Sequence, residues 1–379
     1  MESNYDIGII GGGVIGLSVA YQAMQDARLR GCQPSIVVID QPQSGQASWA
    51  GSGILPPPPQ QISSDPLEQL QRLSLERMPQ WSQDLKQLTG IDNQYESCGG
   101  YYVALTPGEH AALIGLKSFW EEVGIEFELL EHVQFEAKEP WLAGQIPATN
   151  CRLLASVPGE TQLRNPRHLK ALRAACQKMG ITFLDQSVGE PLGWEPFEVR
   201  LSGTKVRLDQ VVVAAGSWTS RWLKQVLPDQ ATHVSVFPMK GQILLYKAPE
   251  RLFSSIVNFG TRYFVPRQDG HLLVGSTEEE VGFAAEPTMQ VRLELQEFVR
   301  RTLPQVEELP LVKQWSGFRP ASFDLTPIIG PLPSLPHVLI ATGHFRSGIQ
   351  WSIGTALCVS AMLHGEQPPM DIRVFARGR

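Results

Sequence analysis

The sequence has few of the features that mark nucleic-acid-binding and membrane-spanning chains. Charged residues make up only 18% of the 379, no basic run occurs, and the net charge is −6. Because a protein that binds phosphate backbones needs a strongly basic face, we expect no nucleic acid among the partners. No segment reaches ~18 unbroken apolar residues, the length that a helix needs to cross a bilayer, so we expect no membrane partner either.

Cysteine is scarce as well. The cysteines are odd in number and form no CxxC pair, which favours small buried residues in a reducing compartment over a disulfide framework or a metal site. The five are Cys32, Cys98, Cys151, Cys176 and Cys358. The apolar segment 7–20 follows acidic rather than basic residues and contains five glycines, so it does not resemble a signal peptide. We expect a cytoplasmic protein with no metal site.

The sequence is rich in apolar residues and in turn formers. Hydrophobic residues make up 42%, and there are 34 glycines and 29 prolines. Buried strands of the parallel type are expected at residues 5–10, 35–39, 210–216 and 337–343. Helices are expected at residues 16–27, from a cap at Asp65 with a kink at Pro79, from Ser217, and from Ser347 to Leu363. Strands of an antiparallel sheet are expected at residues 100–105, 234–247 and 262–276, the last with a hairpin turn at 267–271.

The first strand, turn and helix carry a dinucleotide-binding fingerprint. Gly11, Gly13 and Gly16 form GxGxxG, and Asp40 follows the second strand, where it can bind ribose hydroxyls. The glycines allow a tight turn, close approach of a pyrophosphate, and contact between helix and strand, while the helix N-terminus attracts the phosphates. The alternative interpretation is a glycine-rich loop that binds nothing.

The two ends of the chain together favour FAD over NAD as the ligand. A second glycine-rich junction between strand and helix, residues 341–349, lies close to the C-terminus. A chain that closes its first domain with its last segment can wrap a long ligand, and a helix N-terminus can hold the negative charge of a reduced flavin. Taken by itself, this junction could also be an ordinary buried helix start.

These patterns predict an α/β fold with two domains. The first is a Rossmann-type FAD-binding domain assembled from residues 1–85, 145–220 and 315–379. The second is a substrate domain with a mostly antiparallel sheet, formed by residues 86–144 and 221–314.

Seven segments in a fixed order resemble a known family. They are IGIIGGGVIGLSVA, QASWAGSGIL, VVVAAGSW, VFPMKGQIL, YFVPRQDGHLLVGST, WSGFRPASFDLTPIIG and ATGHFRSGIQ. The chain resembles the flavin-dependent amine and D-amino-acid oxidases, a family that includes the sarcosine oxidases, and most closely its glycine-oxidising members associated with formation of the thiamine thiazole. The resemblance covers nearly the whole chain and is weaker at residues 125–160 and 280–310.

The resemblance implies a set of FAD contacts in this chain. They are Gly11, Gly13, Val14, Ile15, Gly16, Asp40, Ala47, Ser48, Ser52, Gly53, Ile54, Val188, His344, Phe345, Arg346, Ser347, Gly348, Ile349 and Gln350. Asp40 stands where many relatives have Glu. Its side chain is one methylene shorter, so we expect water to bridge its contact with the ribose. Relatives of the sarcosine oxidase type tether the flavin through a cysteine, and residues 315–330 contain none. We therefore expect non-covalent FAD.

The resemblance also implies how a substrate is held. Arg319 matches the arginine that binds the substrate carboxylate, Tyr263 assists it, and Arg346 matches an arginine beside flavin and substrate. Each has a structural alternative: a surface salt bridge for Arg319, a half-buried strand residue for Tyr263, and a helix-end charge for Arg346. Glu278 matches a position that some relatives fill with an apolar residue, and it also belongs to a solvated run of three glutamates.

Oxidation of an amino acid at Cα requires positioning rather than a protein base. Once the amine is neutral, a hydride can pass to flavin N5, so no catalytic residue is expected in the chain itself. We expect glycine, other small amines and D-amino acids as substrates, O2 as acceptor, and a 2-oxo acid, ammonia and hydrogen peroxide as products. A dehydrogenase that reduces a quinone or carrier and a non-enzymatic flavin-binding module are the alternatives. A homo-oligomer is also expected.

Overall fold

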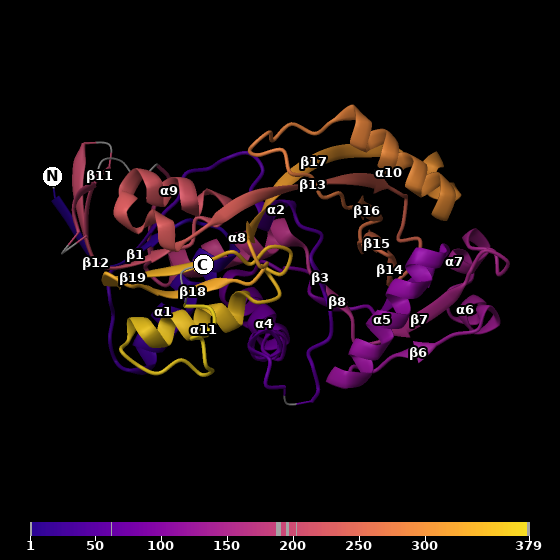
Figure 1. The fold of residues 1–379 in the computed structure, drawn as a ribbon, viewed down its shortest axis with the longest axis horizontal. Coiled ribbons are helices and arrows are strands. Elements are labelled where there is room, and N and C mark those ends of the chain that lie inside the picture. Colours follow the sequence, from indigo (N-terminus) through magenta and orange to yellow (C-terminus); the bar gives the residue numbers. More distant parts are fainter. Residues whose placement is uncertain (1, 62, 187–190, 195–196, 202, 377–379) are drawn as a thin grey trace.

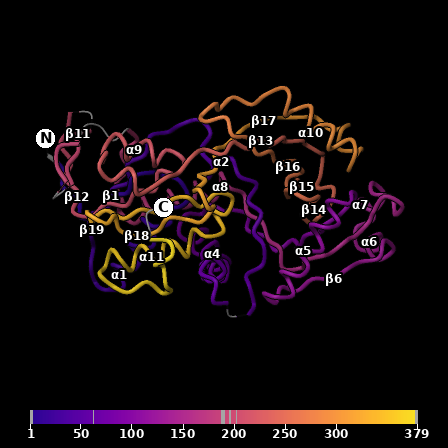
Figure 2. The backbone as a smooth tube through the Cα atoms, viewed as in Figure 1, coloured from indigo at the N-terminus to yellow at the C-terminus, as the bar shows by residue number. Residues whose placement is uncertain are grey.

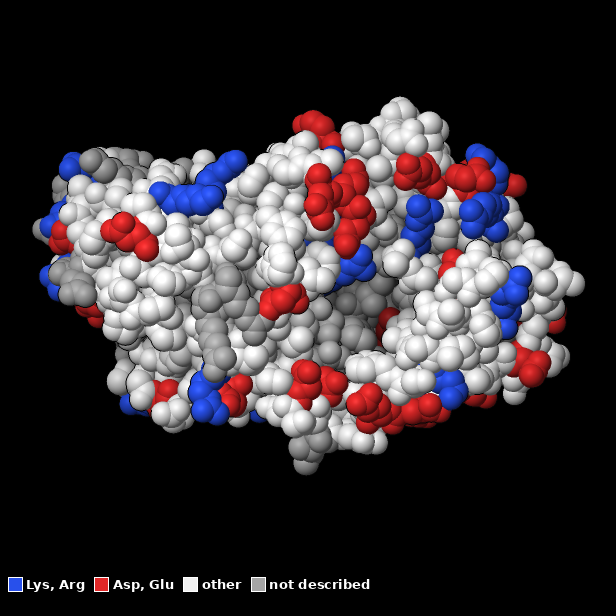
Figure 3. Space-filling view, in the orientation of Figure 1, with Lys and Arg blue, Asp and Glu red and all other residues white. Residues whose placement is uncertain are grey.

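The computed structural model describes residues 2–61, 63–186, 191–194, 197–201 and 203–376. Two large sheets lie side by side along the long axis of the molecule (Figure 1). Both termini belong to the half that contains the first sheet (Figure 1). Acidic and basic side chains are interspersed on the face drawn in Figure 3, most of which is uncharged. Among the described residues, no helix combines the length and the apolar character needed to span a bilayer.

The first sheet has a parallel centre whose strand order is β9-β2-β1-β12-β19. These strands are β1 (Glu2–Ile10), β2 (Ile36–Ile39), β9 (Thr182–Leu184), β12 (Thr204–Val213) and β19 (Leu335–Thr342). Three strands add antiparallel edges: β10 (Pro191–Trp194), β11 (Phe197–Leu201) and β18 (Ile328–Leu332). The chain runs from the centre to one edge and then to the other, which is the doubly wound order of nucleotide-binding folds and confirms the predicted fold class.

Helices cover both faces of this sheet. Ile7 and Ile9 of β1 belong to one hydrophobic cluster and Ile10 to another, as expected for a strand buried on both sides. The first cluster includes residues of α1 (Val14–Leu29), α3 (Pro66–Leu75), α4 (Met78–Thr89), α8 (Asn165–Lys178) and α11 (Ser352–Leu363). The second includes residues of α9 (Thr219–Val226). Helix α11, near the end of the chain, lies beside α1 (Figure 2).

The second sheet is mostly antiparallel, as predicted, with the order β17-β13-β16-β15-β14-β5-β7-β6. Its strands are β5 (Gly100–Ala104), β6 (Glu128–Leu129), β7 (Leu153–Val157), β13 (Val236–Lys247), β14 (Ile256–Phe259), β15 (Arg262–Pro266), β16 (His271–Gly275) and β17 (Leu311–Ser322). Helices α5 (Pro107–Val123), α6 (His132–Lys138), α7 (Pro140–Gln145) and α10 (Met289–Thr302) pack against it. Strand β7 and most of β17 fall in segments that were expected in the first domain, yet both strands pair in this second sheet. The domain boundaries themselves remain a prediction.

The remaining elements are short. A small sheet is formed by β3 (Ile54–Leu55), β4 (Glu96–Ser97) and β8 (Thr161–Gln162). The others are helix α2 (Ala47–Ala50) and the 3-10 turns η1 (Gly216–Trp218), η2 (Pro228–His233) and η3 (Pro304–Glu308).

Three helix predictions were wrong in detail. The helix expected to kink at Pro79 is two helices, because Pro79 occupies the first turn of α4, where its missing N–H is not needed. The last helix begins at Ser352 rather than Ser347, after turns in which the Ser347 N–H donates to His344 O at 2.9 Å. The segment at Ser217 forms η1 first, and α9 begins only at Thr219.

The predicted Asp65 cap and the predicted hairpin are confirmed. Asp65 Oδ1 accepts from the Leu67 N–H at 2.7 Å and from the Glu68 N–H at 3.2 Å. In the hairpin that joins β15 to β16, Gly270 adopts a φ of 81°, a conformation that favours glycine.

Candidate functional site

A cavity of about 700 Å³ opens at the carboxyl ends of the parallel strands. Its lining includes residues that end or directly follow four strands: Ile10 and Gly11 after β1, Asp40 after β2, Ala214 after β12, and Thr342 of β19. In open α/β sheets, ligands bind outside the carboxyl ends of the strands, where the strand order changes direction. The volume lies in the range of ligand cavities, roughly 300–1,000 Å³.

The glycines of the first turn meet different demands. Gly11 has a φ of 112°, and a Cβ there would overlap the carbonyl oxygen of Ala214 on the neighbouring strand segment. A Cβ on Gly16 would overlap the carbonyl oxygen of Gly11, so this glycine allows helix α1 to approach β1. A Cβ on Gly13 would meet only the Ser48 hydroxyl, at 3.2 Å. Gly11 and Gly16 are thus required by the fold, whereas Gly13 lines the cavity and leaves room there.

The N-terminus of α1 faces this cavity and is capped from another part of the chain. Gly13, the residue before the helix, has no side chain that could cap it. Instead, the Ser48 hydroxyl of α2 caps the helix by accepting from the Val14 N–H at 3.0 Å. Asn165 holds α2 in place, since its side-chain amide donates to Ser48 O at 3.0 Å. The first N–H groups of a helix carry partial positive charge, so this end of α1 suits a phosphate.

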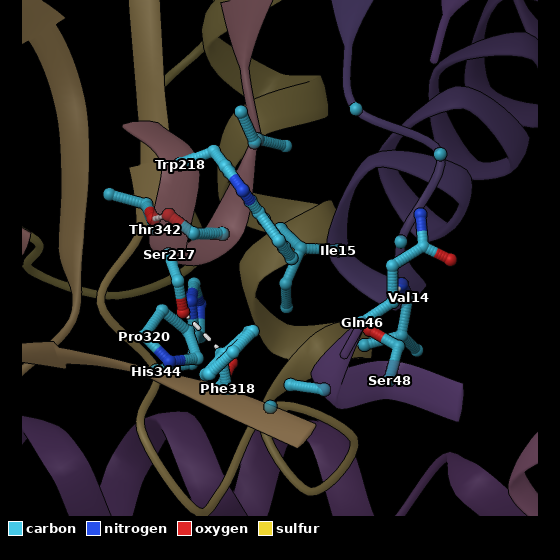
Figure 4. Close-up of a pocket in the computed structure, with 18 of the residues that line it drawn as sticks. Val14, Ile15, Gln46, Ser48, Ser217, Trp218, Phe318, Pro320, Thr342 and His344 are labelled. Atoms are coloured by element: carbon cyan, nitrogen blue, oxygen red, sulfur yellow. Dashed lines mark hydrogen bonds between the residues drawn. The ribbon is translucent and has the colours of Figure 1, made fainter. Parts of the chain in front are cut away.

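The opposite wall is formed where strand β17 meets the C-terminal segment. The Ser217 hydroxyl donates to Phe318 O at 2.8 Å, and the Phe345 N–H donates to Pro320 O at 2.9 Å. Figure 4 shows Ser217, Phe318 and Pro320 across the cavity from Val14 and Ser48. The Phe318 N–H in turn donates to Gly45 O at 2.8 Å, which ties this wall to the loop before α2. Segments far apart in the sequence therefore enclose one space.

His344 is a buried, neutral part of this wall. Its side chain is 1% exposed, and its Nε2 lies 2.9 Å from the Thr355 hydroxyl. Burial lowers the pKa of His344 to about 3. The imidazole therefore carries no proton charge near neutral pH, which suits a residue that lines a cofactor better than one that transfers protons.

Arg319 lies on β17 with its guanidinium over a neighbouring strand. The side chain is 16% exposed, and burial lowers its pKa. Its Nη1 donates to Thr277 O at 3.0 Å and its Nη2 to the Ser276 hydroxyl at 2.8 Å, so both partners are neutral. A Cβ on Gly241 of β13 would lie 2.5 Å from Nη2, so the missing side chain at Gly241 makes space for the guanidinium. A mostly buried cation held by neutral groups is a strong site for a carboxylate.

Arg346 and Glu278 form an ion pair beside Arg319. Arg346 donates from Nε to Glu278 Oε2 at 2.9 Å and from Nη2 to the same oxygen. Glu278 Oε2 also lies 4.0 Å from Arg319 Nη1, without a hydrogen bond between them. Tyr263 lies on the same sheet, and its hydroxyl would be 3.5 Å from a Cβ on Gly275, so it reaches over the strand between its own and β13.

The structure brings most of the predicted site residues to the cavity. Those that line it are Gly11, Gly13, Val14, Ile15, Asp40, Ala47, Ser48, Ser52, Gly53, Ile54, Arg319, His344, Phe345, Arg346, Gly348, Ile349 and Gln350. Gly16, Ser347 and Tyr263 are described but do not line it. Val188 lies outside the described residues. None of the residues that line the described cavity is a cysteine.

The sequence interpretation missed several residues that line or support the cavity. The lining also includes Gln43, Gln46, Ala214, Gly216, Ser217, Trp218, Arg221, Phe318, Pro320 and Thr342. Ala214 to Trp218 lie in a segment that carries the family resemblance, and their place after a buried strand was the signal that could have identified them.

Arg267 does not line the cavity but holds a loop that does. The sequence predicted this residue only as part of a hairpin turn. Its side chain donates to Gln162 Oε1 at 2.7 Å, to Leu163 O at 3.0 Å and to Ser52 O at 2.5 Å. Burial lowers its pKa to about 10. By holding Ser52, Arg267 fixes the loop that carries the lining residues before β3.

Known proteins match this chain over nearly its whole length. Residues 6–362 match the family model DAO, described as FAD dependent oxidoreductase. A glycine oxidase of Pseudomonas aeruginosa is 29% identical over 374 residues, which cover 97% of each chain. The bifunctional protein ThiO/ThiG of Nostoc sp. is 29% identical over 370 residues, 94% of this chain and 52% of that protein. The crystal structure of glycine oxidase from Geobacillus kaustophilus superposes with a TM-score of 0.89 at 26% identity, covering 100% of this chain and 99% of the other.

Proposed function

The chain belongs to the DAO family of FAD-dependent oxidoreductases, and from that membership we propose that it oxidises glycine and other small amino acids. It is an FAD-dependent enzyme of amino-acid oxidation. The finer assignment rests on Arg319, a mostly buried cation that no described carboxylate hydrogen-bonds and that lies at the edge of the cofactor cavity. The names of the similar glycine oxidases support the same substrate class.

The residues that line the cavity fit FAD. The Gly11–Gly13 turn and the N-terminus of α1 would hold the pyrophosphate, because a Cβ-free backbone and helix N–H groups meet there. Asp40 would bind the ribose, and residues His344 to Gln350 would hold the flavin end. When bound, FAD accepts the hydride that leaves the substrate Cα.

The side chains of this protein would act by binding and orienting the substrate. The Arg319 guanidinium would pair with the substrate carboxylate in the bidentate geometry that a planar fork allows, with Tyr263 assisting. A substrate bound through its carboxylate presents Cα and the neutral amine in a fixed direction, which lowers the entropic part of the barrier. We assign no general base to the chain, because the amine loses its proton before the hydride leaves.

The proposed overall reaction converts glycine, O2 and water into glyoxylate, ammonia and hydrogen peroxide. A hydride leaves Cα and a proton leaves the nitrogen to give an imine, water replaces the imine nitrogen as ammonia, and O2 takes up the two electrons and two protons to form hydrogen peroxide. The similarity to the bifunctional ThiO/ThiG protein supports a role in thiamine biosynthesis.

Anaerobic and aerobic flavin spectra test this proposal. Glycine added to the holoenzyme without oxygen should bleach the flavin absorbance, and air should restore it within the time of turnover. Bleaching without reoxidation by air would indicate a dehydrogenase that uses another acceptor. A flavin that neither glycine nor a panel of small amines and D-amino acids can bleach would contradict the proposed function.

A further inference from the structure

Glu278 places a carboxylate between two arginines of the proposed substrate site, Arg319 and Arg346. We propose that Glu278 is a specificity-determining residue that restricts the site to ligands with one carboxylate and rejects dicarboxylates. The proposal rests on the function proposed above, because it takes Arg319 as the carboxylate anchor. It adds the chemical class of ligand that the anchor accepts.

The first observation is that the two guanidiniums are not equivalent. Arg346 directs Nε and Nη2 at a single oxygen of Glu278, so the edge of its fork is occupied. Among the described residues, Arg319 hydrogen-bonds only the neutral Thr277 O and Ser276 hydroxyl, and Glu278 lies at ion-pair distance, 4.0 Å, without a hydrogen bond. One arginine is therefore available to a ligand, and the other is already paired.

The second observation is that one short ligand could reach both arginines. Arg319 Nη1 and Arg346 Nε lie within 4.0 Å and 2.9 Å of the same Glu278 oxygen. Without Glu278, two guanidiniums would flank the position of that oxygen, so a ligand anchored on Arg319 could place a second carboxylate there. With Glu278 present, the second carboxylate of a ligand must approach a negative charge or displace it from Arg346.

The third observation is that the neighbouring glutamates do not share this role. Glu279 is bound elsewhere, with its carboxylate accepting from Gln242 Nε2 at 3.0 Å and from the Thr277 hydroxyl at 2.6 Å. Glu280 is exposed, so neutralising it changes the net charge of the same loop by the same amount. Glu280→Gln is therefore a matched control for Glu278→Gln.

The pair is also suited to substitution without loss of the fold. The Arg346 and Glu278 side chains are 46% and 38% exposed, and ion pairs at such sites contribute little to stability. The loop that carries Glu278 is held by other contacts, including the Lys240 N–H to Glu279 O at 3.0 Å and Lys240 Nζ to Glu286 O at 2.6 Å. Glu278→Gln should keep these contacts and its bound flavin.

The test uses acetate and malonate as unreactive probes of the holoenzyme. Their dissociation constants are read from the perturbation of the flavin absorbance in the parent, Glu278→Gln and Glu280→Gln. We expect the parent and Glu280→Gln to bind acetate in preference to malonate. In Glu278→Gln, the ratio of malonate to acetate dissociation constants should fall by roughly tenfold or more, the effect of one added charge-assisted pair. Adding Arg346→Gln to Glu278→Gln should abolish that gain, because the second guanidinium is then gone.

Two results would overturn the inference: an unchanged ratio in Glu278→Gln with its flavin spectrum intact, or an equal fall in Glu280→Gln. If Glu278→Gln loses its flavin, the parent provides the test by itself. A parent that binds malonate more tightly than acetate would also overturn the inference. Bleaching of the parent by glycine is measured in the same samples. Bleaching without the change in ratio would reject the role of Glu278 alone, and the change in ratio without bleaching would reject the proposed function alone.

Discussion

At the scale of single residues, the site depends on which polar groups are left for a ligand. The guanidinium of Arg319 is held by a backbone carbonyl and a hydroxyl, while His344 is kept neutral by burial. Neither property can be read from the residue type, because each follows from what surrounds the side chain. Substitutions at these positions should therefore change ligand binding more than they change the fold.

Replacing Arg319 should remove the carboxylate anchor and leave the cofactor in place. We expect Arg319→Ala to lower kcat/KM for glycine by roughly 10²–10⁴-fold, the equivalent of ~3–5 kcal/mol for a buried ion pair that loses one partner. Arg319→Lys should recover only part of this loss, since an ammonium lacks the planar fork. Steady-state kinetics with glycine, together with the flavin content of each variant, measures both effects.

A simple amine without a carboxylate serves as the internal comparison for Arg319. Its oxidation should fall far less than that of glycine in Arg319→Ala. Arg301→Ala, an exposed arginine of α10, should behave as the parent. If Arg319→Ala keeps its flavin and oxidises glycine within about threefold of the parent, a change under ~0.7 kcal/mol, then Arg319 is not the anchor.

Gly13 and Gly16 should respond differently to an added side chain. Gly13→Val places methyl groups beside the Ser48 hydroxyl and in the cavity, so this variant should fold but carry little FAD. Gly16→Ala overlaps the Gly11 carbonyl and should lower the free energy of unfolding by about 1–3 kcal/mol. Urea denaturation and the ratio of flavin to protein absorbance separate the two. Normal flavin content in Gly13→Val would mean that the phosphates bind elsewhere.

At the scale of helices and strands, the sequence predicted the features that depend on residues close together in the chain. The β1–α1–β2 unit was predicted because its strands, turn and helix lie within some 36 residues and follow simple periodicities. The start of α11 was misplaced because the turns at residues 348–351 include a hydrogen bond of helical spacing, from the Trp351 N–H to Ser347 O at 2.9 Å, so they resemble a first helical turn. Contacts such as Ser48 to Val14 and Ser217 to Phe318 join residues 34 and 101 positions apart, so no local pattern predicts them.

The junction between β7 and β8 contains a buried carboxyl that should titrate near neutral pH. Glu160 is 1% exposed, accepts from the Tyr102 hydroxyl at 3.2 Å, and packs against Gly100, where a Cβ would overlap its carboxyl group. Burial raises the pKa of Glu160 from 4.5 to about 8. The folded protein therefore binds this proton more tightly than the unfolded chain, and the stability that the proton confers is lost as the pH rises through this window.

Glu160→Gln should become stabilising relative to the parent as the pH rises. Between pH 4.5 and about 8 the advantage of the variant should grow by about 1.4 kcal/mol per pH unit, because unfolding of the parent releases a proton, which a rising pH favours, and unfolding of the variant does not. Urea denaturation of both proteins across this range measures the difference. Glu126→Gln, at an exposed position, should show no such trend. A pH-independent difference for Glu160→Gln would show that the carboxyl is ionised throughout.

At the scale of the whole molecule, the cofactor cavity is built from both ends of the chain. Its lining includes residues that follow β1 and residues that follow β19, and α1 packs against α11. A ligand that contacts both ends binds the folded chain and has no comparable site in the unfolded one. Binding of FAD and folding should therefore be thermodynamically linked.

Removal of FAD should lower the stability of the entire protein. Apoprotein titrated with FAD should gain about 2.7 kcal/mol in the free energy of unfolding at a free concentration 100 times Kd, with a matching rise in Tm. Riboflavin, which lacks both phosphates and the adenosine, should stabilise the apoprotein less at the same concentration. Thermal denaturation at several concentrations of each ligand provides the measurement. A Tm that does not change with FAD would show that FAD does not bind the folded protein in preference to the unfolded chain.

The missing side chain at Gly241 couples two positions on neighbouring strands, position 241 on β13 and position 319 on β17. The Arg319 guanidinium fills the space that a side chain at position 241 would take, with Nη2 only 2.5 Å from that Cβ. A mutation at either position therefore changes the fitness of mutations at the other, and the two should be inherited together as this lineage diverges. An engineer who wishes to move the anchor must redesign both strands at once: a larger residue at 241 becomes acceptable only after the arginine has been removed.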